Sequence, residues 1–282
     1  MKVESLHRHP LKSAAIENVD SLQVLPDGPE GDRRWMVIDG NGRFVSQREF
    51  PKLVTVRPRL DGETLEMNLG GEVVEANVTG TRVQSTIWRD EVSLALADDR
   101  ANNALSDYLG TSVRLARMDS RTQRSVNGEW GSGPVTLADG YPLLVALTSS
   151  LDALNAAIED GGASKVTMDR FRPNIVIGNA PPWDDDGWAA IRIGDVELEI
   201  TKPCVRCSIT TVDQDRGTVV NDEPLATLRR LRMSGDRRVP GVLFGWNATV
   251  RRTGSIAVGD PVEVLARREP WPIRSAAPQP AA

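Results

Sequence analysis

The residues best suited to chemistry lie within 202–213, a stretch that holds both cysteines of the chain, Cys204 and Cys207. The thiolate form of cysteine attacks electrophiles and binds metals, and nearby positive charge favours it over the thiol. Lys202 and Arg206 supply such charge beside the two sulfurs. The segment is therefore the first candidate for a reactive or metal-binding site.

The Cys-x-x-Cys spacing is compatible with several kinds of site. A disulfide would close a very short loop and add little stability. A structural zinc ion requires four Cys or His ligands, and His7 and His9 are the only histidines available. A thioredoxin-like pair requires a βαβ setting that the sequence lacks. Two interpretations then stay open, namely ligation of a redox metal held mainly by a cofactor, or two ordinary buried cysteines.

Strand-like segments flank the cysteines. Val196–Ile200 alternates apolar and acidic residues, and the residues from Ser208 to Val212 are rich in β-branched types. Pro203 has no N–H to give to a strand ladder, so we expect it to end the first strand. This pattern predicts that the cysteines lie on a short loop or strand edge between two strands.

Composition limits the class of protein. The chain has 282 residues and a net charge of −5, with 34 Lys and Arg against 39 Asp and Glu, so no global charge attracts nucleic acid. There is no apolar run of 18 residues and no apolar core of a signal peptide near the N-terminus. Two cysteines do not make a disulfide framework. We expect a soluble, cytoplasmic protein without a membrane partner.

Short strands punctuated by turn residues fill the first third of the sequence, which is typical of a β-barrel or sandwich. A helix is predicted over 99–109, with Asp98 as its N-cap and Gly110 at its end. The polar stretch 119–133 reads as a linker or mobile loop, and it marks a domain boundary. We expect a mainly β fold with a few helices and two β-barrel-like domains. Their predicted limits are 1–120 and 121–268, followed by a disordered tail at 269–282.

The second half contains fewer expected elements. An apolar strand at 143–147 precedes a helix capped by Ser149 or Ser150, and Gly161 ends that helix. A further helix is predicted near 223–233.

Three polar clusters interrupt otherwise ordinary strands, at 10–13, 32–35 and 170–174. Each offers donors suited to a phosphate or a polar heterocycle. His7 and His9 share one face of a strand, as two metal ligands would, although a solvated strand edge is the simpler interpretation. No phosphate-binding glycine loop and no His-Glu-x-x-His motif is present.

Taken in order, these segments resemble the successive signatures of the MOSC-domain molybdenum enzymes, in the branch of the amidoxime-reducing components. The resemblance covers nearly all of residues 1–267, and its strongest parts are Arg-Pro-Asn and Cys-x-x-Cys. It implies an N-terminal β-barrel-like domain followed by a MOSC β-barrel. The segments that carry it are Pro10-Leu11-Lys12-Ser13, Gly31-Asp32-Arg33-Arg34-Trp35, Phe171-Arg172-Pro173-Asn174, Cys204-Val205-Arg206-Cys207, Leu243-Phe244-Gly245 and Val258-Gly259-Asp260-Pro261-Val262.

The resemblance also implies a cofactor, the molybdenum cofactor (Mo-molybdopterin), and a set of residues that bind it. Cys207 matches the cysteine that ligates the metal and takes part in catalysis, whereas Cys204 matches one that does not ligate. Asn247 stands where the family often has a tyrosine. The matched cofactor-binding residues are Lys12, Ser13, Arg33, Thr148, Arg172 and Asn174.

The implied activity is a two-electron, molybdenum-dependent reduction of N-hydroxylated compounds such as amidoximes, hydroxylamines and N-hydroxylated bases. Beyond Cys207 the sequence has too few cysteines for an iron–sulfur cluster. We therefore expect an external electron donor, either a ferredoxin or a cytochrome b5 with its NAD(P)H reductase. Two alternatives are a sulfur carrier or transferase that uses a cysteine persulfide, and a non-enzymatic protein that binds the molybdenum cofactor.

Overall fold

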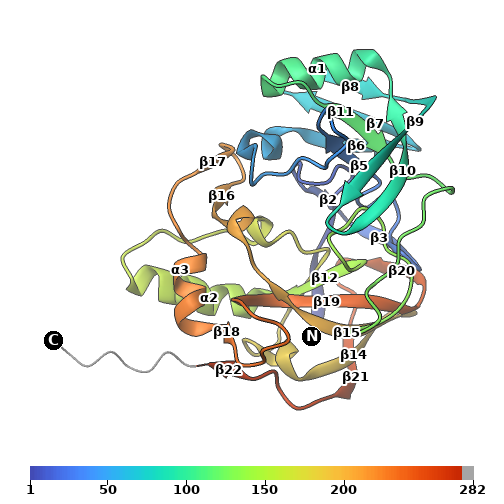
Figure 1. Ribbon diagram of the computed structural model, residues 1–282. Helices are drawn as coiled ribbons and strands as arrows, with labels where there is room; N and C mark the ends of the chain where they lie inside the picture. The colour runs from blue at the N-terminus through green and yellow to red at the C-terminus, as the bar shows by residue number, and fades with distance from the viewer. Residues whose placement is uncertain (275–282) are drawn as a thin grey trace.

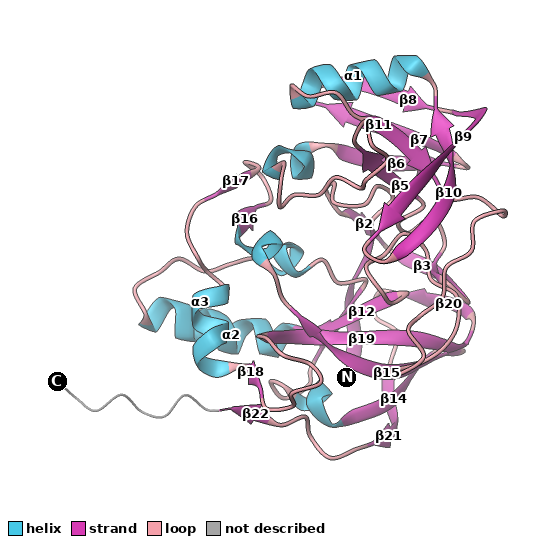
Figure 2. Cartoon of the chain, in the orientation of Figure 1, coloured by secondary structure: helices cyan, strands magenta, loops and turns pink. Residues whose placement is uncertain are grey.

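The computed structural model describes residues 1–274, and strands dominate it (Figures 1 and 2). The α-helices of this part are α1 (Asp99–Leu109), α2 (Thr148–Asp160) and α3 (Leu225–Leu231). The predicted mainly β fold class is confirmed. None of the helices described is long and apolar enough to span a membrane.

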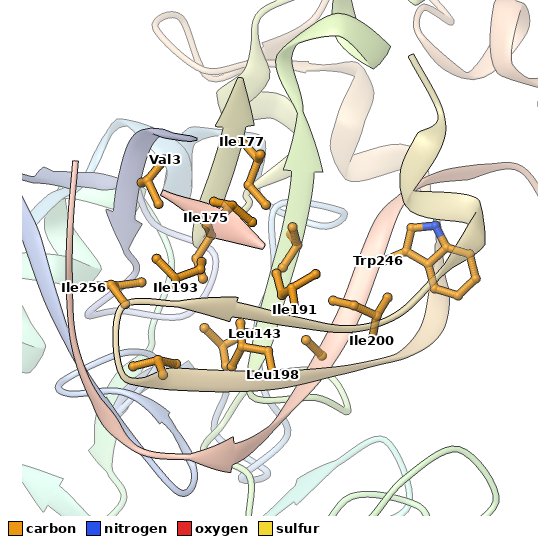
Figure 3. Packing of buried hydrophobic residues seen from close by; sticks show 14 of the residues in the cluster. Val3, Leu143, Ile175, Ile177, Ile191, Ile193, Leu198, Ile200, Trp246 and Ile256 are labelled. Carbon is orange, nitrogen blue, oxygen red and sulfur yellow. The ribbon is translucent and has the colours of Figure 1, made fainter. Parts of the chain in front are cut away.

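The largest element is a curled sheet of eight strands in the order β2-β1-β13-β12-β19-β15-β14-β21. Its buried face carries alternating Ile, Leu and Val side chains, which Figure 3 shows packed together around Ile191 and Leu198. The burial of these side chains, rather than any single contact, holds the sheet in its curled shape. The strands are β1 (Lys2–Arg8), β2 (Glu17–Val19), β12 (Leu143–Leu147), β13 (Ile175–Gly178), β14 (Trp188–Ile193), β15 (Val196–Val205), β19 (Leu243–Arg252) and β21 (Val262–Arg267).

Smaller sheets make up the upper part of the molecule in Figure 1. One has the order β5-β11-β10-β9 and another β6-β7-β8, while β20-β3-β4 joins them to the large sheet. Their strands are β3 (Ser21–Leu25), β4 (Gly28–Pro29), β5 (Trp35–Ile38), β6 (Arg57–Asp61), β7 (Thr64–Leu69), β8 (Glu72–Ala76), β9 (Val78–Ile87), β10 (Asp90–Ala97), β11 (Arg114–Arg117) and β20 (Gly254–Ala257).

Helix α1 has the termini that the sequence predicts. The Asp98 carboxylate accepts a hydrogen bond from the N–H of Ala101 at 2.9 Å, and Gly110 ends the helix with φ 74°. Helix α2 differs from its prediction, because no serine side chain caps it. It begins at Thr148, one or two residues before the expected cap, and Ser150 Oγ instead accepts from the N–H of Trp183.

Cys204 lies near the end of a strand and Cys207 on the loop that follows it, in agreement with the predicted loop or strand edge. Strand β15 runs through Pro203 and Cys204 and ends at Val205. Beyond Ile200 it pairs only with β19, because its pairing with β14 stops at Glu199. A proline that lacks an N–H is tolerated in a strand that has one unpaired side, and a bulge lies on each side of Pro203. The expectation that Pro203 ends the strand is therefore wrong.

The predicted strand from Ser208 to Val212 is largely replaced by a 3₁₀ helix, and a second segment forms a similar turn. Ser208–Thr211 forms a 3₁₀ helix, η4, and only Val212–Asp213 (β16) is extended, paired with β17 (Thr218–Val219). Pro51–Thr55 likewise forms a 3₁₀ turn, η1, before β6 begins.

The C-terminal segment is ordered further than the sequence suggests. Ile273–Arg274 (β22) pairs with Met233–Ser234 (β18), and the Trp271 ring lies 5.8 Å from that of Trp246. The prediction of a disordered tail is wrong for residues 269–274, because the aromatic contacts of Trp271 anchor them. The remainder of the predicted tail, 275–282, lies outside the described residues.

The first strands of the chain belong to the large sheet. β1 pairs with β13, placing Leu6 opposite Ile175, and β3 pairs with β20. The eight-stranded sheet therefore contains residues from both sides of the expected boundary near residue 120.

Candidate cofactor site

Five of the predicted site residues line one cavity of about 130 Å³. They reach it from four separate loops, after β1, before β5, after the 3₁₀ turn Met168–Phe171 (η2) and after β15. The large sheet and the upper sheets therefore both contribute to the cavity wall. The five residues are Lys12, Ser13, Arg33, Arg172 and Cys207.

Three of these residues have left-handed backbone conformations. The φ angles are 67° at Ser13, 47° at Arg33 and 56° at Arg172. Residues other than glycine rarely adopt this conformation, because it brings Cβ close to the following carbonyl oxygen. Such strained positions cluster at functional sites. Glycine would adopt this conformation without strain but has no side chain. The three positions therefore keep their side chains at a conformational cost.

Arg172 is a buried cation in the wall of the cavity, with 9% of its surface exposed. Its Nη1 donates to the backbone oxygen of Ala14 at 2.6 Å, whereas its Nη2 has no hydrogen-bond partner among residues 1–274. Burial and the neighbouring Arg33 lower the pKa of Arg172 to about 9. An anion in the cavity would relieve both effects.

His9 supports Arg172 from behind. Its Nε2 lies 3.0 Å from the backbone oxygen of Arg172, and the side chain is fully buried. Burial, together with Arg33, lowers the pKa of His9 well below its ordinary value, so the ring is neutral. His7 is also buried and contacts Ser5 and Asn18. The interpretation of these histidines as a solvated strand edge is wrong, because both rings face into the structure.

Lys12 forms an ion pair with Asp139 at the rim of the cavity. Burial lowers the pKa of Lys12, and the Asp139 carboxylate offsets part of that effect. Partial burial opposes ionisation of Asp139, but Lys12 and Arg48 hold the pKa of its carboxyl well below its usual range. The rim is therefore a charged pair, with Lys12 only 5% exposed on the inner side.

Asn174 holds Arg33 in place rather than lining the cavity. Its Oδ1 accepts from Arg33 Nη1 at 3.3 Å and from the N–H of Leu144 at 3.1 Å. Its Nδ2 donates to Asp32 at 3.1 Å, and Asp32 accepts from Arg33 at 2.5 Å. Asn174 is fully buried. The predicted residue thus lies at the site and acts through Arg33.

Thr148 does not belong to this group. It lies beyond the end of β12, whereas Leu143 and Leu144 at the start of that strand line the cavity. The hydroxyl of Thr148 donates to Glu4 at 2.5 Å. At ~3.3 Å per strand residue, about four residues of β12 separate it from the cavity wall by more than 10 Å. The predicted placement of Thr148 at this site is therefore wrong.

Each cysteine sulfur accepts a hydrogen bond from an arginine. Arg48 Nη2 lies 3.2 Å from the Sγ of Cys207, and Arg206 Nη1 lies 2.8 Å from that of Cys204. Both cysteines are free thiols and half-buried. Arg206 is adjacent in sequence and was noted for its charge. Arg48 was missed, because it is 159 positions from Cys207 and belongs to no motif.

The cavity suits an anionic group that brings its own metal. Arg172 Nη2 and Arg206 Nε are both buried without a partner, although both residues line the cavity. Unpaired guanidinium N–H groups of this kind are costly unless a ligand accepts from them. Among residues 1–274, no three His, Cys, Asp or Glu side chains gather as metal ligands. The donor set is thus the sulfurs of Cys204 and Cys207 beside several cations suited to a phosphate.

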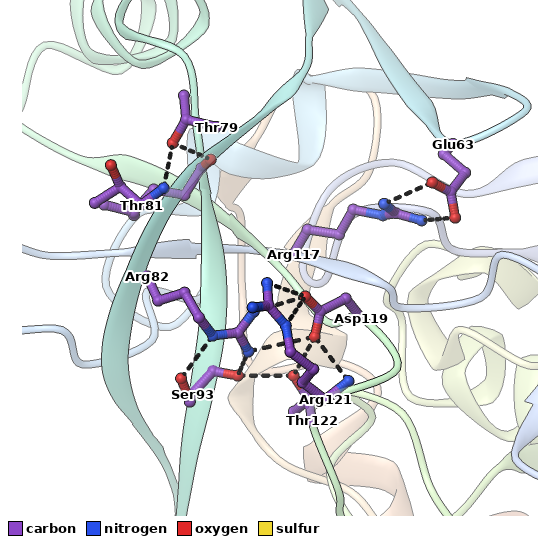
Figure 4. Close-up of polar contacts among 10 residues, drawn as sticks. Glu63, Thr79, Thr81, Arg82, Ser93, Arg117, Asp119, Arg121 and Thr122 are labelled. Atoms are coloured by element: carbon purple, nitrogen blue, oxygen red, sulfur yellow. Dashed lines mark hydrogen bonds and ion pairs between the residues drawn. The ribbon is translucent and has the colours of Figure 1, made fainter.

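A larger cleft, of about 980 Å³, lies under the loop that follows β11. Its arginines are already satisfied by carboxylates, so it lacks the unpaired donors of the smaller cavity. Figure 4 shows two of the ion pairs at this cleft, Arg117 with Glu63 and Arg82 with Asp119. Other pairs there are Arg8–Glu17, Arg34–Asp27 and Arg124–Asp90.

Comparison with known proteins identifies both parts of the chain. Residues 1–112 match the model of the MOSC N-terminal beta barrel domain, and residues 132–263 match that of the MOSC domain. Mitochondrial amidoxime-reducing component 1 of Danio rerio is 30% identical over 275 residues, which cover 92% of this chain and 83% of that protein. Mitochondrial amidoxime reducing component 2 of Rattus norvegicus is 31% identical over 276 residues, covering 90% and 80%.

Solved structures that match are more distant. The YUAD protein from Bacillus subtilis aligns over 93% of each chain with 11% identity and a TM-score of 0.37. The family assignment rests instead on the domain models and the sequence relatives. The chain belongs to the MOSC-domain family, in the group that includes the amidoxime-reducing components.

Proposed function

We propose that this protein is a molybdenum-cofactor-dependent reductase of N-hydroxylated compounds. The observation that carries the proposal is the cavity in which the sulfur of Cys207 faces a set of cations with unpaired N–H groups. The names of its relatives, amidoxime-reducing components, support the same reaction class. The net reaction consumes two electrons and two protons, cleaves the N–O bond and releases water.

The protein residues have separable roles in this proposal. Arg172, Arg33 and Lys12 bind the phosphate and pterin of the cofactor, since guanidinium and ammonium groups form strong charge-assisted hydrogen bonds with such anions. Cys207 ligates the metal through its thiolate. When bound, the cofactor supplies the two-electron redox chemistry, and the protein orients it and tunes it.

Arg48 has a positioning role beside the metal ligand. Its guanidinium donates to the Sγ of Cys207 and also reaches toward Asp139. A hydrogen bond to a ligating thiolate fixes its orientation and moderates its charge. Loss of Arg48 would therefore change the environment of the sulfur while leaving the phosphate-binding cations in place.

Electrons must come from a separate protein in this proposal. The two cysteines of the sequence are too few for a four-cysteine cluster in addition to the metal ligand. A ferredoxin, or a cytochrome b5 with its NAD(P)H reductase, could deliver electrons one at a time. Reconstitution with each donor would identify the one that supports turnover.

The first test is elemental analysis of protein made in a host that synthesises molybdenum cofactor. We expect about one molybdenum per chain in the wild type and almost none in Cys207→Ala, because a single protein thiolate holds the metal. Cys204→Ala is the matched control, since its sulfur also accepts a hydrogen bond from an arginine but is assigned no ligand role. It should retain the metal.

Activity is then measured with benzamidoxime and an artificial electron donor. Loss of reduction in Cys207→Ala, with retention in Cys204→Ala, supports the assignment of the ligand. Wild-type protein that contains zinc or no metal would overturn the proposal. Release of sulfide on treatment with cyanide would then point to persulfide chemistry at one of the cysteines.

A further inference from the structure

A second cavity, of about 630 Å³, opens beside the cofactor cavity. Phe44, Ser46 and Arg48 line both cavities, so the two adjoin. The size falls within the range of small-molecule sites, about 300–1,000 Å³. Its distinctive feature is the aromatic wall formed by Phe44 and Trp88.

Trp88 occupies a position that normally takes glycine. Ile87 pairs with Asp90, so Trp88 and Arg89 form the two-residue turn between β9 and β10. Its φ angle is 56°, and that of Arg89 is not positive. In type II′ hairpin turns this first central position favours glycine, because a bulky side chain is strained there. Trp88 is nevertheless 50% exposed. An exposed indole at a strained position calls for a function.

The surroundings hold the indole in a fixed place. Its Nε1 donates to Asp139 at 3.2 Å, and its ring meets the edge of Phe44 at a centroid distance of 5.2 Å. Asp90, next in the turn, pairs with Arg124 at 2.7 Å, and Arg124 in turn donates to the backbone oxygen of Ala138. The turn is therefore tied to the same loop that carries Asp139 into the cofactor cavity.

Arg48 connects this aromatic wall to the sulfur. Its guanidinium lies 4.9 Å from the centroid of the Trp88 ring and donates to Cys207 at 3.2 Å. A planar group placed against Trp88 would therefore be separated from the proposed metal ligand, Cys207, by about the length of the Arg48 side chain. Stacking on aromatic rings and on guanidinium planes favours planar, conjugated groups.

We propose that Phe44 and Trp88 form the subsite that binds the aromatic ring of an N-hydroxylated substrate, and that Arg48 positions its N–OH group toward Cys207. This inference rests on the proposed function. It predicts a preference for amidoximes attached to an aromatic ring over small aliphatic ones. The position of this cavity directly beside the cofactor cavity favours a small substrate over a protein partner at this wall.

The test compares benzamidoxime with acetamidoxime in molybdenum-loaded wild type, Trp88→Ala and Trp88→Phe. We expect Trp88→Ala to lose about tenfold in kcat/KM for benzamidoxime, through KM, because one aromatic stacking partner is removed. The value for acetamidoxime should change less than about twofold, and Trp88→Phe should recover most of the loss. Equal losses for both substrates, or none for benzamidoxime, would overturn the subsite.

Trp130→Ala is the matched control. Its ring also lies 4.9 Å from a guanidinium, that of Arg238, but it lines neither cavity. Both substrates should react with it as with wild type. Binding of benzamidoxime, measured by ligand-observed NMR, separates this inference from the proposed function. Binding that weakens in Trp88→Ala without any turnover in wild type would support the subsite and overturn the reductase. Turnover by wild type that does not change in the Trp88 variants would support the reductase and overturn the subsite.

Discussion

Residues with a left-handed backbone gather around the proposed site. Among residues 1–274, six non-glycine residues have a positive φ, and four of them, Ser13, Arg33, Trp88 and Arg172, line the two adjoining cavities. Each costs of order 1–3 kcal/mol, which the rest of the fold offsets. Substituting glycine would relieve the backbone and remove the side chain that does the binding.

A buried carboxyl outside the site gives a prediction about pH. Asp185 is 2% exposed, and burial together with the nearby Asp186 raises its pKa to about 7. In the unfolded chain the ordinary value is 3.8. Because the folded-state pKa is the higher one, the folded state binds the proton more tightly. Stability therefore falls as the pH rises from about 4 to 7, and the loss is complete above 7.

Asp185→Asn should remove this dependence. We expect the variant to gain on the order of 3 kcal/mol over wild type at pH 8 and less than half as much at pH 5. Urea unfolding at the two pH values measures the difference. Asp184→Asn is the control, since pairing with Arg267 lowers the pKa of that neighbour and its loss should destabilise. A gain for Asp185→Asn that is equal at both pH values would contradict the assignment.

The sequence identified those site residues that belong to motifs. Lys12, Ser13, Arg33, Arg172 and Cys207 lie in contiguous signatures, and the structure brings them to one cavity. The other contributors, Arg48, Trp88 and Asp139, occupy turns and loops with no local signature. They meet the motif residues only because separate sheets pack together, so no spacing in the sequence could show it.

At the scale of single elements, the sequence correctly predicted features that depend only on neighbouring residues. The termini of α1 follow from one capping carboxylate and one glycine. The path of β15 does not follow from local rules, because the tolerance of Pro203 depends on which edge of the strand has a neighbour. The alternation of apolar residues predicts where strands form, but it does not predict which strands pair with one another.

The cap of α1 can be tested directly. Asp98 accepts from the N–H of Ala101 through one oxygen and from the N–H of Asn77 through the other, each at 2.9 Å. Asp98→Ala should therefore lower the free energy of unfolding by about 1–2 kcal/mol. Asp107→Ala, at an exposed position of the same helix, should change it by less than about 0.5 kcal/mol. Denaturant titration of both variants would show whether the cap carries this energy.

At the scale of the whole molecule, the large sheet unites distant parts of the sequence. β1 lies between β2 and β13, and its Val3 and Leu6 side chains are completely or almost completely buried in the core of that sheet. Burial of each such side chain contributes about 1.5–3 kcal/mol. The segment 121–274 alone would lack this strand and the β3 partner of β20.

Dividing the chain at residue 120 should therefore abolish independent folding of the second part. We expect 121–282 expressed alone to be insoluble or to lack a cooperative thermal transition, because the β13 edge and its apolar face would be exposed. Co-expression with 1–120 should restore a soluble complex. A cooperative transition of 121–282 alone would show that β1 is dispensable.

The placement of β1 also constrains the time course of folding during synthesis. Leu6 pairs with Ile175, so about 170 residues leave the ribosome before the partner exists, roughly 8 to 35 seconds at 5–20 residues per second. Throughout this interval β1 can pair with β2, but its other edge has no partner within the chain. Nascent molecules therefore carry an unpaired strand edge for most of translation, which makes them natural clients of ribosome-associated chaperones.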